Sequence, residues 1–137
     1  MIVLDTNVVS ELMKPVPDGR VRDWLAGLGE VALTTTAVTV AEIEYGLQRM
    51  AAGRRRADLA ASFEVSIGAL GILPLDDVAA RHAGQLRARR DPAGLPSQGM
   101  DMLIAGIAMA AGASLATRNV SDFAGLPLEV VNPWGGA

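Results

Sequence analysis

Four acidic residues of this chain stand at positions where an α/β protein usually carries its chemistry. Asp5 directly follows a short apolar run at residues 2–4, and Asp122 follows an uncharged run at residues 114–117. Glu42 and Asp101 lie in the first turns of two segments whose apolar residues have helical spacing. Crowded carboxylates repel one another, and Mg²⁺ complements them because it prefers oxygen ligands and binds through one or two carboxylates plus substrate phosphates. Since such an ion activates water and offsets the charge of an attacked phosphodiester, the four acids favour metal-assisted hydrolysis.

Each acid also has a structural interpretation that the sequence leaves open. Glu42 completes Thr39-Val40-Ala41-Glu42, a capping box in which the Glu side chain accepts a hydrogen bond from the backbone N–H of the N-cap residue. Asp101 is an acid that a helix dipole favours, and Asp122 is a turn former. Asp5 is the hardest to explain in this way, because an acid directly after a buried strand needs partners or a cation.

The elements that must position these acids follow from the apolar pattern. Strands are predicted at residues 2–4, 31–35, 72–75, 114–117 and 128–131. Helices are predicted after Thr6 as an N-cap, from Val21 to near Gly29, from Thr39 to Gly53, from Arg54 to about Leu70, from Asp76-Asp77 through Leu86, and from Asp101 to Ala111, with a loop at 91–96. This alternation predicts an α/β fold of three α/β/α layers, with a central, mainly parallel sheet of four to five short strands. Ligands of such sheets bind beyond the carboxyl ends of the strands, which is the edge where all four acids are expected.

The composition indicates one globular domain of 137 residues in a reducing compartment. Cysteine is absent, which excludes disulfides, thiolate zinc sites and cysteine nucleophiles. The uncharged run from Met102 to Thr117 is shorter than the ~20 apolar residues of a membrane span. The N-terminus has no signal-peptide pattern, so we expect a cytoplasmic protein. The net charge of −3 gives no overall attraction to nucleic acid, and the acidity is concentrated in the four acids.

Four segments, in order, resemble the successive motifs of PIN-domain proteins. They are Leu4-Asp5-Thr6-Asn7, Thr39-Val40-Ala41-Glu42-Ile43-Glu44-Tyr45-Gly46, Asp101-Met102-Leu103-Ile104-Ala105 and Ala116-Thr117-Arg118-Asn119-Val120-Ser121-Asp122-Phe123. More narrowly, the chain resembles the VapC-type, FitB-like toxins of bacterial toxin–antitoxin pairs. The resemblance covers essentially the whole chain, which implies a single PIN domain over residues 1–137.

This resemblance implies an endoribonuclease that depends on Mg²⁺, or on Mn²⁺ as a substitute. It further implies a homodimer that a small antitoxin protein holds inactive. Carried over position by position, the catalytic and metal-binding acids are Asp5, Glu42, Asp101 and Asp122, and the supporting polar residues are Thr6, Asn7, Thr117 and Asn119, with Thr117 acting through its hydroxyl. Arg118 lies beside this site, where it can touch an RNA phosphate or pair with one of the acids.

Two other kinds of function compete with this interpretation. A catalytically silent PIN-like scaffold that only binds a protein partner would be favoured by the loss of an acid, and none is lost. A phosphoryl-accepting domain is disfavoured, because Asn7 stands where a phosphatase needs a second acid and the only lysine is Lys14. His82 is the only histidine, which disfavours a ribonuclease that uses a histidine acid–base pair.

The arginines leave one question open. They gather at residues 54–56 and again at Arg87, Arg89 and Arg90. Such runs are either solvated helix faces or a phosphate-binding rim.

Overall fold

Five parallel strands form the centre of the molecule. The computed structural model describes residues 1–91 and 99–135. The strands of this part are β1 (Ile2–Leu4), β2 (Leu33–Thr36), β3 (Gly71–Leu73), β4 (Ser114–Ala116) and β5 (Val130–Val131), in the order β3-β2-β1-β4-β5. Every pairing in this sheet is parallel. The predicted α/β fold is therefore confirmed, with a sheet that is parallel throughout.

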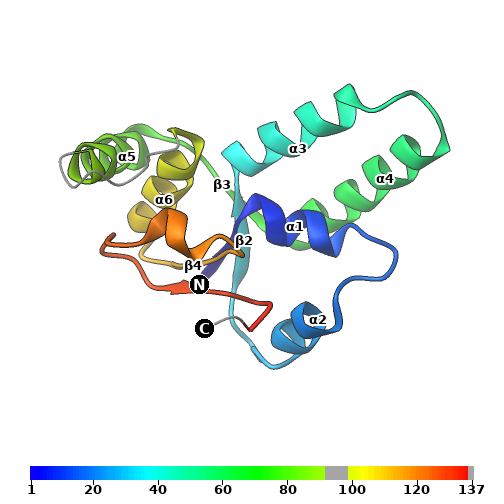
Figure 1. Cartoon of the computed structure of the whole chain (residues 1–137), viewed down its shortest axis with the longest axis horizontal. Helices are drawn as coiled ribbons and strands as arrows, with labels where there is room; N and C mark the ends of the chain where they lie inside the picture. Colours follow the sequence, from blue (N-terminus) through cyan, green and yellow to red (C-terminus); the bar gives the residue numbers. More distant parts are fainter. Residues whose placement is uncertain (92–98, 136–137) are drawn as a thin grey trace.

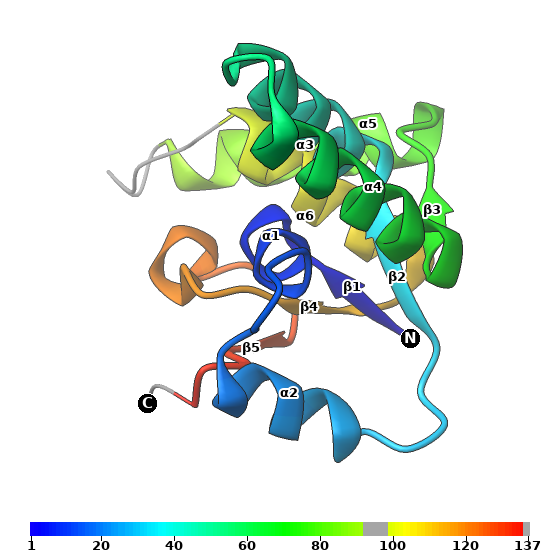
Figure 2. The same cartoon turned by 90° about the vertical axis from the view of Figure 1, so that its right-hand side faces the viewer.

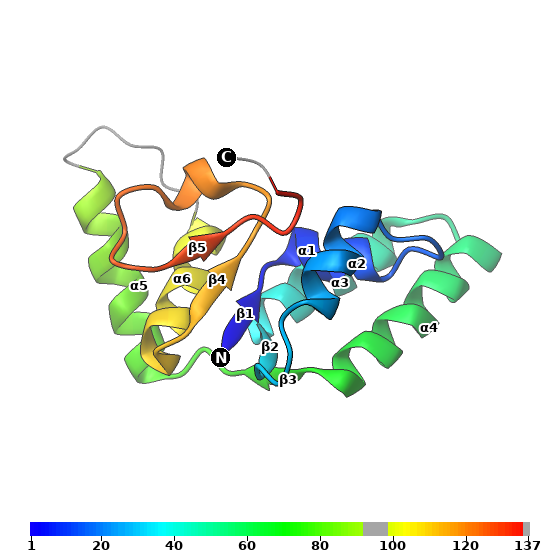
Figure 3. The same ribbon diagram turned by 90° about the horizontal axis from the view of Figure 1, so that it is seen from below.

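Helices cover both faces of the sheet, as the predicted three layers require. They are α1 (Thr6–Leu12), α2 (Gly19–Ala26), α3 (Ala37–Arg49), α4 (Arg54–Ala69), α5 (Asp77–Arg90) and α6 (Gly99–Ala111), with a 3₁₀ turn, η1, at Val120–Phe123. The helices α5 and α6 lie on one face, and α1 to α4 lie on the other (Figure 1, Figure 3). Figure 2 looks onto the second layer, with α1 in its middle, α3 and α4 on one side and α2 on the other.

Two apolar cores follow from the alternation of side chains along each strand. Val3 and Leu115 point to the face of α5 and α6, where they pack with a cluster that includes Ile104. Leu4 and Ala116 point to the opposite face and join the core under α1 and α3. Because both faces are covered, the strands are short and uncharged, which is the pattern from which they were predicted.

Two of the three threonines of β2 donate their hydroxyls to the neighbouring strand β1. Thr34 donates to the carbonyl of Ile2 at 3.1 Å, and Thr35 donates to the carbonyl of Leu4 at 2.8 Å. The strand continues to Thr36, one residue beyond the predicted end, and begins at Leu33, because Val31 and Ala32 are exposed and precede the covered part.

Two predicted helix starts are wrong. Asp5, not Thr6, is the N-cap of α1, and its carboxylate accepts the Thr6 amide at 2.8 Å. Thr36, not Thr39, is the N-cap of α3, because its backbone is still extended at φ −119° and ψ 157° and its hydroxyl accepts the Thr39 amide at 3.0 Å. Glu42 therefore lies in the second turn of α3, beyond the capping-box position, and the capping-box interpretation of Glu42 is wrong.

Helix α6 is held closely against α5 by small residues. A Cβ atom on Gly106 would lie 2.5 Å from the carbonyl oxygen of Ala79 and 2.7 Å from the amide nitrogen of Ala83. The predicted start of α5 is confirmed, because Asp76 caps it by accepting the Ala79 amide at 2.9 Å. This packing fixes α6, whose first turn carries Asp101.

Several predicted boundaries shift by a few residues. Helix α2 ends at Ala26, α3 ends at Arg49 and β5 is confined to Val130–Val131. Most of the loop predicted at 91–96 lies outside the described residues. None of the helices in residues 1–91 and 99–135 is long and apolar enough to cross a membrane.

Candidate active site

Asp5 is enclosed at the carboxyl end of the central strand β1. Only 4% of its surface is exposed. Besides the Thr6 amide at Oδ1, its Oδ2 accepts the Thr117 hydroxyl at 2.7 Å and the Asn7 side-chain amide at 3.3 Å. Burial nevertheless raises the pKa of Asp5, and the charge of Asp122 raises it further, while these three donors pull it down. Asp5 is thus a fixed carboxylate whose charge is only partly compensated.

The residues that follow β4 support Asp5 from the neighbouring strand. Thr117 is fully buried, and its hydroxyl accepts the Asn7 side-chain amide at 3.2 Å and the Asn119 backbone amide at 3.1 Å. The side-chain oxygen of Asn7 accepts the backbone amide of Arg118 at 3.1 Å. The side chains of Asn7 and Thr117 therefore contact Asp5, whereas Asn119 contributes through its backbone.

Glu42 reaches the same edge of the sheet from α3. The Thr6 hydroxyl donates to its Oε1 at 2.9 Å. Glu42 is half-buried, and its pKa is raised by burial and by the charge of Asp5, with the Thr6 hydrogen bond acting in the opposite direction. Glu44, two positions on, is exposed and accepts a hydrogen bond from Gln48, so it takes no part in this cluster.

Asp101 is the acid with the strongest need for a counter-charge. Its pKa is raised to about 6, first by burial and then by the charges of Asp5, Asp122 and Glu42. Within residues 1–91 and 99–135, no hydrogen bond to its half-buried carboxylate is found, and the nearby charge of Arg90 offsets only part of the effect. The charges of Asp5, Glu42 and Asp122, which come from three other parts of the chain, therefore all reach Asp101 at this edge of the sheet.

Arg90 is a residue of this region whose setting the sequence interpretation missed. Both interpretations of the arginine run placed it in solvent or at a rim, but only 2% of Arg90 is exposed. Its Nη1 donates to the carbonyl oxygen of Ala124, directly after η1. The helical spacing shows why it is buried: Ala83, Leu86 and Arg90 share the buried face of α5. The exposed members of the two runs include Arg54, Arg55, Arg87 and Arg89.

Arg118 does not pair with any of the four acids among the described residues. Its guanidinium lies over the ring of Trp134, 5.0 Å from the ring centroid. Arg20 lowers the pKa of Asp18 to about 2, chiefly by hydrogen bonds, and the charge of Arg118 adds to this effect. The Arg118 head group is therefore held on the C-terminal segment beside the site.

The donor set fits a hard divalent cation such as Mg²⁺. In the described part of the chain, no three His, Cys, Asp or Glu side chains are close enough to hold one metal ion among them. Mg²⁺ does not require such a cage, since it keeps several waters and binds through one or two carboxylates. The partly desolvated Asp101 carboxylate, which lacks a described hydrogen bond and lies in the field of three other acids, is the feature that such an ion would satisfy.

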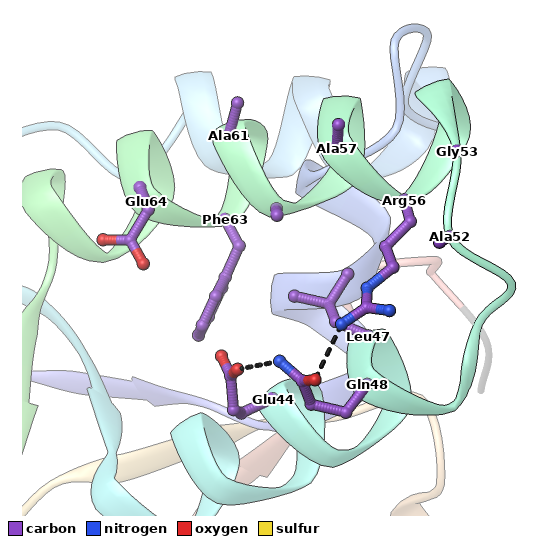
Figure 4. A pocket seen from close by; sticks show the side chains of 11 residues that line it. Glu44, Leu47, Gln48, Ala52, Gly53, Arg56, Ala57, Ala61, Phe63 and Glu64 are labelled. Atoms are coloured by element: carbon purple, nitrogen blue, oxygen red, sulfur yellow. Dashed lines mark hydrogen bonds between the residues drawn. The ribbon is translucent and has the colours of Figure 1, made fainter.

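A separate cavity of about 520 Å³ lies between α3 and α4 (Figure 4). Its walls include Leu47 and Phe63, and none of the four acids lines it. Arg56 donates to Gln48 at 2.7 Å and Gln48 donates to Glu44 at 2.8 Å, which links the two helices. The cavity is thus part of the α3–α4 hairpin and is distinct from the acidic site.

The fold and this constellation of acids define the class of protein. The model of the PIN domain family matches residues 2–125, and the chain belongs to that family. It is 40% identical over 137 residues to VapC ribonuclease Y4jK of Sinorhizobium fredii, covering 98% of both chains. It is 35% identical over 137 residues to Toxin FitB of Neisseria gonorrhoeae, covering 98% of this chain and 99% of that one. The crystal structure of DNA-bound VapBC from Salmonella typhimurium superposes with a TM-score of 0.83 at 28% identity, covering 96% of this chain and 97% of that chain.

Proposed function

We propose that this protein is a Mg²⁺-dependent endoribonuclease and the toxin of a VapBC-type toxin–antitoxin pair. Mn²⁺ substitutes for Mg²⁺ in this proposal, and the acidic site consists of Asp5, Glu42, Asp101 and Asp122. The similarity to a VapC ribonuclease and to a FitB toxin over nearly the whole chain supports the nuclease and toxin assignments.

One observation carries the proposal for the site. The pKa of Asp101 is raised to about 6 because burial and three acids from other elements act on it together. A fold does not benefit from such repulsion unless something of opposite charge binds there, and perturbed groups of this kind cluster at functional sites. A catalytically silent scaffold has no use for a half-buried acid that three other acids repel, which disfavours that alternative.

The chain's own residues have separable roles in this proposal. Asp5 and Asp101 would hold the ion, with Glu42 and Asp122 adding charge around it. When bound, Mg²⁺ activates water and offsets the charge of the attacked phosphodiester. Thr117 and Asn7 fix the orientation of Asp5 by donating to its Oδ2. Arg118, held on Trp134, binds an RNA phosphate next to the cleavage position.

The proposal includes two protein partners. The first is a small antitoxin protein, in keeping with the toxin and VapBC names of the relatives. The second is another copy of this chain, since the resemblance to VapC-type toxins implies a homodimer.

The direct test is RNA cleavage by the purified, antitoxin-free protein with and without divalent ions. We expect cleavage in millimolar Mg²⁺ or Mn²⁺, no cleavage in EDTA, and a higher melting temperature in Mg²⁺, because an ion that binds only the folded state stabilises it. Cleavage that persists in EDTA would disprove the mechanism. A melting temperature that ignores Mg²⁺, together with no cleavage, would favour the silent scaffold.

A further inference from the structure

A line of three hydroxyl groups leads from the start of α3 to the Glu42 carboxylate. The Thr36 hydroxyl donates to the Thr39 hydroxyl at 3.3 Å, and the Thr39 and Thr6 hydroxyl oxygens are 3.1 Å apart. The Thr6 hydroxyl then donates to Glu42 Oε1 at 2.9 Å. Thr36 and Thr39 are fully buried, so water does not replace these partners.

The number of protons fixes the direction of this chain. Each hydroxyl has one proton to donate, and an ionised carboxylate only accepts. The Thr6 proton therefore points to Glu42, the Thr39 proton to Thr6 and the Thr36 proton to Thr39. The Thr36 oxygen in turn accepts the Thr39 backbone amide at 3.0 Å, so the chain begins at a fixed amide and ends at the carboxylate.

Such a chain holds Glu42 more firmly than a single hydrogen bond does. Hydrogen bonds in series polarise one another, and each bond is electrostatically stronger in the buried interior than in water. Thr6 and Thr39 lie on different helices, so the chain also joins α1, which Asp5 caps, to α3, which carries Glu42. The hydrogen bonds of the described residues engage Oε1 of Glu42 and leave Oε2 available.

We propose that Thr39 is a positioning residue for RNA cleavage. Through Thr6 it holds the Glu42 carboxylate in one orientation, with Oε1 engaged and Oε2 available to the acidic site. Thr39 itself touches none of the four acids in the described hydrogen bonds, so its effect passes through Thr6. The inference rests on the function proposed above. The competing explanation is that Thr39 only satisfies a buried polar group at the start of its helix.

Two substitutions at one position separate these explanations. Thr39→Val keeps the shape and removes the hydroxyl, and Thr39→Ser keeps the hydroxyl and removes a methyl group. We expect Thr39→Val to lower kcat by about 10- to 100-fold, the range found for residues that orient metal ligands, with KM unchanged. Thr39→Ser should recover kcat to within about threefold of the wild type on the same grounds.

Thr34→Val is the matched control. Thr34 is also buried, and its hydroxyl donates to the carbonyl of Ile2 without any link to Glu42. This variant undergoes the same chemical change and should keep the wild-type kcat. If Thr39→Val did not fold, Thr39→Ala and Thr6→Val would interrupt the same chain at two different positions.

A second measurement is independent of catalysis. The carboxyl carbon-13 signal of Glu42, assigned by its absence in Glu42→Gln, is recorded in EDTA at constant pH. It should move in Thr39→Val and stay in place in Thr34→Val. In addition, Thr39→Val should lower kcat little further when Glu42→Gln is already present, because residues that act through one group are not additive.

The outcomes are distinct. A wild-type kcat and an unmoved Glu42 signal in Thr39→Val would overturn the positioning role, as would an equal loss in Thr34→Val. A wild-type protein that cleaves no RNA in Mg²⁺ would overturn the proposed function instead. The Glu42 signal would then still decide whether Thr39 orients this carboxylate.

Discussion

The end of β1 and the first turn of α6 each present an acid to the same site, yet the fold treats the two acids differently. Asp5 is 4% exposed and accepts hydrogen bonds from Thr6, Asn7 and Thr117. Asp101 is half-buried and, in the described part of the chain, accepts none. Burial is the main cause of a raised pKa at both, but only Asp101 is also acted on by three other acids.

This difference indicates that the two acids have different roles within one acidic site. Asp5 is oriented before anything binds, since its donors come from its own helix and from the strand beside it. Asp101 is held by the packing of α6 against α5 and is otherwise open to a ligand. Asp5 thus supplies a ligand in a fixed orientation, and Asp101 supplies an uncompensated charge that favours the binding of a cation.

Neutralising each acid in turn should produce the largest effects. We expect Asp5→Asn and Asp101→Asn each to lower RNA cleavage by more than about 100-fold, since changes in residues that merely orient metal ligands already cost about 10- to 100-fold. Both variants should also lose the rise in melting temperature in Mg²⁺. Cleavage assays and thermal unfolding test this, and full activity in either variant would move the chemistry elsewhere.

In metal-free buffer, the same two substitutions should change the melting temperature in opposite directions. Asp101→Asn removes a repelled, partly desolvated charge and should raise the melting temperature. In Asp5→Asn, an amide NH₂ must face either the Thr6 amide or the Asn7 and Thr117 donors. A buried donor left in this way costs about 1 to 3 kcal/mol, so Asp5→Asn should unfold at a lower temperature. Equal shifts in the two variants would contradict the contrast between an enclosed and an open acid.

Disturbing the support of Asp101 alone should have an intermediate effect. Gly106→Ala places a Cβ atom against the backbone of α5, and overpacking of this kind costs about 1 to 3 kcal/mol. We expect lower stability in urea unfolding and reduced cleavage, because α6 must shift. Gly84→Ala on α5 is the control, since its Cβ atom would meet nothing within 4 Å and the change should stabilise the helix by about 0.5 to 1 kcal/mol. A Gly106→Ala protein as stable as the wild type would show that α6 is not held in this way.

The sequence predicted the fold and the four acids for a simple physical reason. Short uncharged runs that alternate with helical spacing are compatible with few arrangements, and parallel strands bring their carboxyl ends to one edge. Asp5 follows such a run directly, and Asp122 lies in the short turn after another. Their neighbourhood could therefore be predicted without knowing any contact.

The predictions that are wrong concern features that depend on tertiary contacts or on the exact residue at which a helix begins. Thr36 and Thr39 are both good N-caps, and the choice between them is decided by α3 beginning at Ala37, directly after β2. The charged neighbours of Arg90 predict an exposed side chain, whereas its position in the helical repeat places it on the buried face of α5. The hydroxyl chain from Thr36 to Glu42 could not be predicted, because it depends on the distance between α1 and α3, which neither segment encodes locally.

The smallest expected effect is a change in stability with pH. The folded pKa of Asp101 is about 6, above its unfolded value of 3.8, so the folded chain binds a proton in a range where the unfolded chain does not. In metal-free buffer, stability should therefore rise as the pH falls from 7 to about 4, by about 1 to 2 kcal/mol once the two-unit shift is discounted for solvent screening of this half-exposed group. Asp5 and Glu42, whose pKa values are also raised, act in the same direction.

Two acids outside the acidic site end this rise in stability at low pH. The pKa of Asp18 is lowered to about 2 by Arg20, and that of Glu11 is lowered by Lys14, so their stabilisation is lost as the pH falls below about 4. In urea unfolding between pH 4 and 8, the free energy of unfolding should thus be largest near pH 4 to 5. Asp101→Asn should make its dependence on pH between 5 and 8 weaker. In Mg²⁺ the dependence should reverse, because protons and the ion compete for Asp101 and the gain from Mg²⁺ disappears below about pH 6. A metal-free wild type that is less stable at pH 5 than at pH 7 would contradict the open, repelled state of Asp101.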